Sequence, residues 1–213
     1  MPTKPKSLID FDLAFGRSVA GADEAGRGCL AGPIVAAGVR FDYDKLSDRQ
    51  IEMIGELNDS KKFDSERREE LLVIVTECAS SVALVVRSAP YIDAFGLHKT
   101  NLHCLGTALS RVHRPECTLL SDGYMPFGLR EPCEPIVKGD ATSAAIAAAS
   151  IVAKVTRDRF MRRISADHPG WGFEQHVGYS TKPHRDAIVE LGMSPLHRRS
   201  FASSAYEQLE LVA

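Results

Sequence analysis

The sequence has few cysteines and no arrangement of them that would cross-link the chain. Its five cysteines are scattered, odd in number and without a Cys-x-x-Cys pair, which argues against a disulfide framework and against a structural zinc site. The first 16 residues contain no apolar run of signal-peptide length. The longest uncharged, mostly apolar stretch, residues 141–153, is too short to span a bilayer. We therefore expect a cytoplasmic protein with reduced thiols and no membrane contact.

The sequence also lacks an excess of charge of either sign. It contains 26 Lys and Arg residues against 28 Asp and Glu, a formal net charge of −2, and taken alone this balance argues against a general polyanion binder. The charge is unevenly distributed, because residues 151–200 contain nine Lys and Arg against five Asp and Glu, or +4, which leaves −6 elsewhere. The sum therefore conceals a basic C-terminal segment and an acidic remainder.

No repeat, low-complexity tract or long linker divides the chain, so we treat residues 1–213 as one unit, with 44% apolar residues to form a core. Segments rich in Val, Ile and Ala alternate with segments in which apolar residues recur at helical spacing, which is an α/β pattern. We expect strands over residues 18–23, 32–41, 82–86, 117–120 and 135–138. We expect helices over residues 64–79, 97–112, 143–164, 183–191 and 203–212, the third of them buried at its start and solvated at its basic end.

Acidic residues stand where the expected strands end. Asp23 and Glu24 close the first strand, Asp122 follows the fourth and Asp140 follows the fifth. Strand ends are where ligand sites gather in α/β sheets. A single such aspartate is usually a turn former or helix cap, but four carboxylates held together repel each other unless a divalent cation lies between them. With no His or Cys in these motifs, Mg²⁺ or Mn²⁺ is favoured over Zn²⁺.

Two neighbouring acids pose a geometric problem. Adjacent residues of a regular strand point to opposite faces, so Asp23 and Glu24 should not both face one metal ion. Either regular strand geometry ends at Asp23, as the nearby Gly26 and Gly28 indicate, or Glu24 reaches round from the rim. Both alternatives remain open at this point.

A glycine-rich loop follows the first strand. Gly21, Gly26 and Gly28 miss the intervals of a dinucleotide fingerprint, the loop leads into a strand rather than a helix, and no P-loop is present. The segment Gly26-Arg27-Gly28 is then either a tight hairpin connection or a place where the backbone approaches a ligand closely, because a Cβ would obstruct such an approach.

Five segments, in order, resemble ribonuclease HII, the bacterial type 2 ribonuclease H, from about Ser18 to Phe201: GADEAGRGCLAGPIVAAGV, LNDSKKFDSERREEL, LLSDGYMP, IVKGDATSAAIAAASIVAKVTRDRFM and HPGWGFEQHVGYSTKPHRDAIVELGMSPLHRRSF. The resemblance implies an α/β fold, a ribonuclease-H-like mixed sheet flanked by helices. The core would span about residues 18–165, and a helical C-terminal, substrate-binding extension about residues 166–213. Cys29, Phe63 and Ser121 depart from the usual residues of the family without removing a carboxylate.

The resemblance also implies an activity and its residues. The family hydrolyses the RNA strand of RNA/DNA hybrids and cuts 5′ to single ribonucleotides in duplex DNA, leaving 3′-hydroxyl and 5′-phosphate ends. Two Mg²⁺ or Mn²⁺ ions, about 4 Å apart, would clamp the attacking water and the leaving oxygen. Catalytic and metal-binding residues would be Asp23, Glu24, Asp122 and Asp140, with Asp23 bridging and Asp158 excluded. Substrate-binding residues would be Gly26, Arg27, Gly28, Lys61, Lys62, Tyr179 and Lys182.

Further basic residues are expected to contact phosphates, notably Arg157, Arg159, Arg162 and Arg163 along the solvated end of the long helix. No role is assigned to His176, His184 or His197, since a surface or hydrogen-bonded histidine is the commoner case. The expected partner is an RNA/DNA hybrid or a DNA duplex containing ribonucleotides, bound by a monomer. Two other hypotheses remain: a different two-metal nuclease of the same fold, and a non-catalytic binding protein, against which the full carboxylate set argues.

Overall fold

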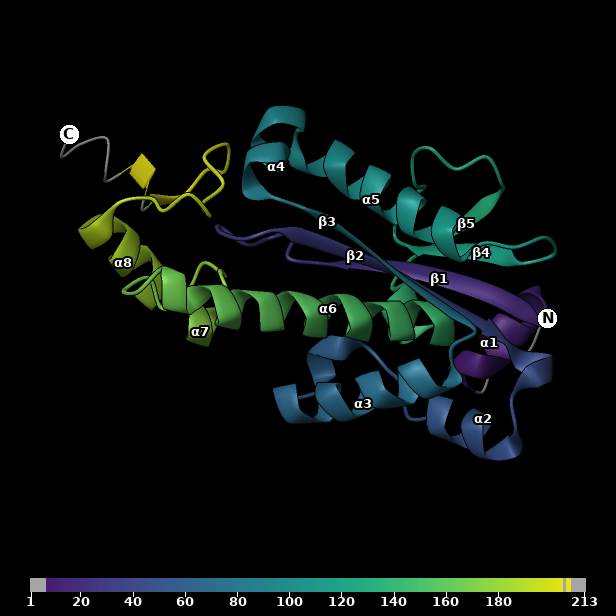
Figure 1. Cartoon of the computed structure of the whole chain (residues 1–213). Coiled ribbons are helices and arrows are strands. Elements are labelled where there is room, and N and C mark those ends of the chain that lie inside the picture. Colours follow the sequence, from purple (N-terminus) through teal and green to yellow (C-terminus); the bar gives the residue numbers. More distant parts are fainter. Residues whose placement is uncertain (1–6, 205, 208–213) are drawn as a thin grey trace.

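The computed structural model describes residues 7–204, 206 and 207. Its centre is a five-stranded mixed sheet in the order β3-β2-β1-β4-β5 (Figure 1). The strands are β1 (Ser18–Ala25), β2 (Ile34–Asp42), β3 (Ser81–Arg87), β4 (Thr118–Asp122) and β5 (Cys133–Ile136). The first three form an antiparallel meander, whereas β4 runs parallel to β1 and β5 runs parallel to β4. The carboxyl ends of β1, β4 and β5 consequently meet at one end of the sheet.

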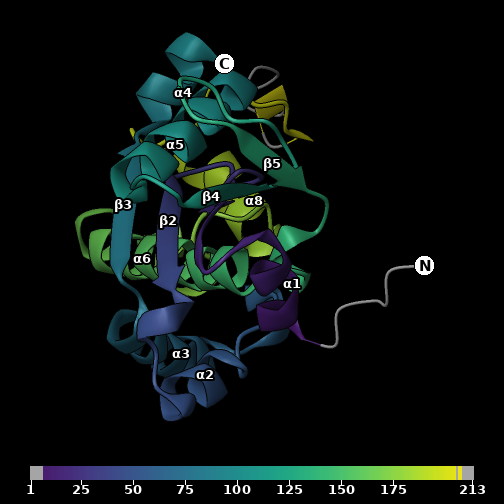
Figure 2. The same cartoon turned by 90° about the vertical axis from the view of Figure 1, so that its right-hand side faces the viewer.

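Helices cover both faces of the sheet. One face is covered by α4 (Ala89–Phe95) and α5 (Leu97–Val112), and the other by α6 (Ala144–Ile164), beyond which lie α2 (Asp48–Ile54) and α3 (Ser65–Cys78) (Figures 1 and 2). The alanines of residues 144–149 are all fully buried, so the backbone of α6 packs closely on the sheet. This burial explains why the first half of α6 is nearly free of polar residues.

The remaining elements lie at the two ends of α6. Helix α1 (Leu8–Phe15) packs beside its first turn, where the backbone N–H of Ala145 donates to Asp12 Oδ2 at 2.9 Å. Helices α7 (Phe173–His176) and α8 (Lys182–Leu191) lie at the opposite end (Figure 1). Four short 3₁₀ turns are designated η1 (Tyr43–Lys45), η2 (Ser60–Lys62), η3 (Gly139–Ala141) and η4 (Ser165–Asp167).

The α/β fold with a mixed sheet flanked by helices is confirmed. The five expected strands are all present, but β1 continues to Ala25 and β5 begins and ends two residues earlier than predicted. Helices α1, α2, α4 and α7 were not predicted; each is eight residues or shorter, which leaves little periodicity to detect. The expected helix over residues 203–212 lies largely outside the described residues. Among the residues described, no helix has the length and apolarity needed to cross a bilayer.

Candidate active site

The ends of β1, β4 and β5 bring the predicted acids together. Asp23, Glu24 and Asp122 line a cavity of about 260 Å³. Asp122 Oδ1 accepts a hydrogen bond of 2.7 Å from the backbone N–H of Gly139, which fixes the η3 turn against the end of β4. That turn places Asp140, itself buried, beside the cavity. Three strand ends thus concentrate four acidic residues in one small region.

Asp23 and Glu24 approach the cavity from opposite faces of the sheet. Regular strand geometry does not end at Asp23, because β1 pairs with β2 as far as Ala25. The Asp23 carboxylate accepts a hydrogen bond from Ser150 of α6, whereas Glu24 lies beside Asn101 of α5, on the other face. Of the two alternatives, the second is therefore correct: Glu24 reaches round the end of the sheet.

Burial and mutual repulsion disfavour the ionised forms of these acids. Burial is the main cause that raises the pKa of Asp23 well above its usual range, and the charges of Glu24 and Asp122 add to it. Burial also raises the pKa of Glu24, although Asn101 and Arg27 oppose it. For Asp122, burial outweighs the Gly139 hydrogen bond and again raises the pKa. One buried and two partly buried carboxylates that repel each other form a site to which a cation would add compensating charge.

Lys61 supplies part of that compensation in the protein alone. Its Nζ lies 3.3 Å from Asp140 Oδ2. Partial burial disfavours the charged ammonium, but Asp140, Asp59 and Asp23 outweigh this and raise the pKa of Lys61. Within the described part of the chain, no three His, Cys, Asp or Glu side chains form a ready-made metal cage. The donor set suits a hard divalent cation by its chemistry, since it consists of carboxylate oxygens alone.

The glycine loop and Tyr179 form the other walls of the cavity. Gly26, Arg27 and Gly28 line it, and an Arg27 nitrogen lies 4.0 Å from Glu24 Oε1. Tyr179 is 38% exposed. The Lys154 ammonium nitrogen lies 4.8 Å from the centroid of this ring.

Lys62 and Lys182 lie outside the lining of this cavity. Lys62 Nζ donates to Asn58 Oδ1 at 2.9 Å, and Lys182 Nζ donates to Asp186 at 2.6 Å. Most of the residues expected to bind metal or substrate therefore line one cavity: Asp23, Glu24, Gly26, Arg27, Gly28, Lys61, Asp122 and Tyr179. Asp140 does not line it but contacts Lys61, which does.

Four residues at the site were not anticipated from the sequence. Ser60 and Ser150 are joined by a hydrogen bond of 2.8 Å between their hydroxyl oxygens, and both line the cavity with Lys154. The fourth, Asn101, is fully buried beside Glu24. Ser150 was detectable in principle, because it is the single polar residue in the otherwise apolar run of residues 144–153. A polar residue inside such a run needs a buried partner.

The expectation that Arg157 lies on the solvated end of α6 is wrong. Arg157 is fully buried, and its guanidinium donates to the carbonyl oxygens of Pro33, Val177 and Ala31, each at 2.9 Å. Helical periodicity turns it toward the glycine loop rather than toward solvent. Arg159, two positions on, is exposed and pairs with Glu69.

Asp158, which the resemblance excludes from the metal site, is surrounded by basic side chains. It is buried and lies 2.9 Å from Lys154 Nζ and 3.9 Å from an Arg68 nitrogen. These two cations compensate the Asp158 charge, whereas the carboxylates in the cavity face one another.

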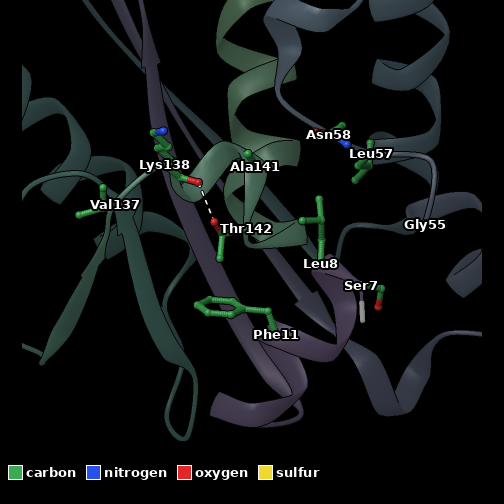
Figure 3. Close-up of a pocket in the computed structure, with 10 residues that line it drawn as sticks. All are labelled: Ser7, Leu8, Phe11, Gly55, Leu57, Asn58, Val137, Lys138, Ala141 and Thr142. Atoms are coloured by element: carbon green, nitrogen blue, oxygen red, sulfur yellow. Dashed lines mark hydrogen bonds between the residues drawn. The ribbon is translucent and has the colours of Figure 1, made fainter. Parts of the chain in front are cut away.

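A larger hollow lies on the other side of residues 58–61. Its volume is about 710 Å³, and α1 lines it through Leu8 and Phe11, opposite Val137 and Lys138 (Figure 3). No acidic side chain is among its lining residues. Size alone would favour this hollow as the site, but its lining offers no carboxylate for a cation and no exposed titratable group besides Lys138. We therefore place the chemistry in the smaller, carboxylate-lined cavity.

The mixed sheet, the covering helices and the carboxylates at its parallel strand ends define the class of ribonuclease-H-like hydrolases. Comparison with known proteins agrees: the Ribonuclease HII family model matches residues 20–204. Ribonuclease HII of Parvibaculum lavamentivorans is 44% identical over 206 residues, 93% of this chain and 74% of that protein. Ribonuclease HII of Brucella suis is 46% identical over 188 residues, 87% of this chain and 82% of that protein. The crystal structure of ribonuclease H2 from Pyrococcus horikoshii OT3 superposes with a TM-score of 0.75 at 25% identity, covering 91% of this chain and 98% of that one. The chain belongs to the ribonuclease HII family.

Proposed function

We propose that this ribonuclease H cleaves the RNA strand of RNA/DNA hybrids and cuts on the 5′ side of single ribonucleotides in duplex DNA, leaving 3′-hydroxyl and 5′-phosphate ends. The observation that carries the proposal is the cavity in which Asp23, Glu24 and Asp122 face each other beside an accessible glycine loop. Family membership supports the same reaction. Residues 1–213 would act as one monomeric, cytoplasmic unit in which residues 166–213 help to bind the substrate.

The carboxylates would bind two divalent cations, Mg²⁺ or Mn²⁺, through Asp23, Glu24, Asp122 and Asp140. Such ions supply an activated water and charge stabilisation in phosphodiester hydrolysis. Asp23 is suited to the shared position, because it is the acid whose charge is opposed by both Glu24 and Asp122. Lys61 holds the Asp140 carboxylate in place, and its ammonium is free to turn to a substrate phosphate once Asp140 has another partner.

The walls of the cavity would hold the nucleic acid. A protein distinguishes RNA from DNA by the ribose 2′-hydroxyl, and Gly26, Arg27, Gly28 and Tyr179 lie next to the carboxylates, where the scissile ribonucleotide must sit. The Tyr179 ring would pack on a sugar. Lys62 and Lys182, which lie outside the cavity, would contact phosphates farther along the duplex and add affinity that weakens as the salt concentration rises.

The decisive experiment maps the cut in a labelled DNA duplex that contains one ribonucleotide, with Mg²⁺ or Mn²⁺ and with EDTA. We expect a single cut 5′ to the ribonucleotide, with no product in EDTA. An all-DNA duplex of the same sequence is the control. Equal cleavage of the two duplexes would identify a different two-metal nuclease, and cleavage in EDTA would exclude the proposed metal site.

Two neighbouring glycines provide a second prediction. Gly26 has a φ of +91°, and a Cβ there would lie 2.0 Å from Arg157 Nε, so Gly26→Ala should cost roughly 2–3 kcal/mol of unfolding free energy. A Cβ on Gly28 would meet nothing within 4 Å. Gly28→Ala should therefore stay within about 1 kcal/mol of wild type in urea unfolding. If the loop approaches the ribose closely, Gly28→Ala should still raise KM by about tenfold. An unchanged KM would mean that Gly28 is not at the substrate.

A further inference from the structure

Three histidines from the C-terminal extension form one buried cluster. His176 ends α7, His184 lies in the first half of α8, and His197 lies in the segment that follows α8. They are 9%, 0% and 2% exposed. The rings of His176 and His184 stack with centroids 4.2 Å apart, and His184 Nε2 lies 3.1 Å from His197 Nε2. The mechanism above does not use this cluster.

The hydrogen-bond pattern assigns one proton to each of the two linked rings. His184 Nδ1 lies 2.8 Å from the carbonyl oxygen of Tyr179, which only accepts, so Nδ1 must carry the hydrogen. His184 Nε2 is then bare and accepts from His197 Nε2–H. His197 Nδ1 in turn accepts from the backbone N–H of Ser194 at 2.9 Å. Burial lowers the pKa of both His184 and His197 to about 4, which keeps these rings neutral near pH 7.

This chain of donors ends on the backbone of Tyr179. The turn before Tyr179 is unfavourable by itself, because the β-branched Val177 has a φ of 45°. The backbone N–H of Tyr179 donates to the carbonyl of His176 at 2.9 Å, and its carbonyl accepts from His184. Together with the backbone N–H of Thr181, which donates to the same carbonyl at 2.8 Å, the side chain of His184 fixes the peptide that sets the direction of the Tyr179 ring.

The same segment also holds the glycine loop. The backbone N–H of Leu30 donates to the carbonyl of Gly178 at 2.9 Å, and the fully buried Arg198, next to His197, donates to the carbonyls of Arg27 and Gly32 at 3.0 Å. Both walls of the cavity are thus tied to the segment that contains the histidines. A displacement of His184 would be transmitted to the Tyr179 wall first, because the direct hydrogen bond is to Tyr179.

We propose that His184 is a positioning residue for substrate binding: its Nδ1–H holds Tyr179 at the mouth of the carboxylate cavity and so sets the affinity for the ribonucleotide. This inference rests on the proposed function, in which Tyr179 contacts the substrate. His184 is not itself among the residues that line the cavity, and its contact with the lining is the hydrogen bond to the backbone of Tyr179, so its effect passes through Tyr179.

Two amide substitutions distinguish the role of His184 Nδ1 from that of Nε2. In His184→Asn the side-chain N–H₂ replaces Nδ1–H and can still donate to Tyr179. In His184→Gln the amide reaches the position of Nε2, which keeps an acceptor for His197 but removes the donor to Tyr179. The assay is steady-state cleavage of a labelled duplex with one ribonucleotide in Mg²⁺. We expect H184N to stay within about threefold of wild type in KM. H184Q should raise KM about tenfold, with kcat nearly unchanged, because uniform binding is lost.

Combining H184Q with Tyr179→Ala distinguishes a positioning role of His184 from a general effect on packing. If His184 acts through Tyr179, H184Q should raise KM no further in the Y179A background. An equal increase of KM in H184N and H184Q, or an additional increase in the double variant, would overturn the proposal. If Y179A alone leaves KM unchanged, the proposed substrate contact itself is wrong, and this result is distinct from the previous two.

Folding is followed by thermal melting of each variant. Should H184Q not fold, His197→Leu tests the same chain of hydrogen bonds, because it removes the hydrogen bond that His184 Nε2 accepts and that helps to hold the ring. We then expect a KM increase of about threefold that disappears in the Y179A background. A KM equal to that of wild type in His197→Leu would overturn the proposal.

Discussion

Asp23→Asn should abolish cleavage and at the same time make the folded protein more stable. Asp23 is buried, and the charges of Glu24 and Asp122 oppose its ionisation. Asparagine removes the charge that a divalent cation would bind, so we expect a loss of at least about 10³-fold in cleavage rate. It also removes the buried repulsion, and the free energy of unfolding at pH 8 in EDTA should rise by about 1–2 kcal/mol.

Asp42→Asn is the matched control at the other end of the sheet. Asp42 is as buried as Asp23, but it accepts a hydrogen bond of 2.7 Å from Ser18 and lies 3.0 Å from an Arg114 nitrogen. Although burial disfavours its charge, Ser18, Lys45 and Arg40 outweigh this and lower the pKa of Asp42. Asp42→Asn should therefore destabilise the protein by about 1–3 kcal/mol and leave cleavage unchanged.

Urea unfolding and single-turnover cleavage of both variants test whether Asp23→Asn stabilises the protein and abolishes cleavage while Asp42→Asn destabilises it and leaves cleavage unchanged. A folded Asp23→Asn variant that cleaves at the wild-type rate would refute the metal-site assignment. A destabilisation by Asp23→Asn equal to that by Asp42→Asn would show that the carboxylates in the cavity do not repel one another in the free protein.

Arg157→Met should be the most destabilising substitution along α6. It removes three charge-assisted hydrogen bonds and deprives the carbonyls of Pro33, Val177 and Ala31 of this buried donor. We expect a loss of about 3–5 kcal/mol in the free energy of unfolding, measured by urea denaturation. Since these carbonyls lie just after the glycine loop and just before Tyr179, KM should rise as well.

Arg159→Met is its control, two residues away on the same helix. Arg159 is exposed and pairs with Glu69, an ion pair of a kind that contributes at most about 1 kcal/mol. We expect its unfolding free energy and KM to remain close to wild type. Similar losses in the two variants would contradict the burial of Arg157.

The sequence predicted long elements better than short ones. Helix α5 begins and ends as predicted, and α6 begins within one residue of its prediction, because both extend over several turns of regular periodicity. Helix α4 and the short β5 were missed or displaced. Their placement depends on packing against α5 and on pairing with β4 rather than on a local pattern.

The residues of the candidate site also fall into those that the sequence predicted and those that only the structure revealed. The motifs predicted the four acids, because each stands at or just after a strand end and near a glycine, and the structure brings Asp23, Glu24 and Asp122 to one cavity. They did not identify Asn101 or Ser60, which come from elements distant in sequence and meet the carboxylates only in the folded chain. They also placed Arg157 in solvent, since a basic run on a helix shows its charge but not which side faces another segment.

The order of residue types along the chain was enough to predict the family and the α/β class, which are confirmed, and to single out the four candidate carboxylates. The tertiary structure alone decided how Asp23 and Glu24 reach one cavity, since β1 stays regular and two helices on opposite faces hold one side chain each. It alone decided that Arg157, Arg198 and the three histidines are buried, with Arg157 and Arg198 hydrogen-bonded to backbone carbonyls in and after the glycine loop and His184 to that of Tyr179. Burial and hydrogen-bond partners are properties of contacts between distant segments, and a charged or titratable residue acquires its role only when those contacts form.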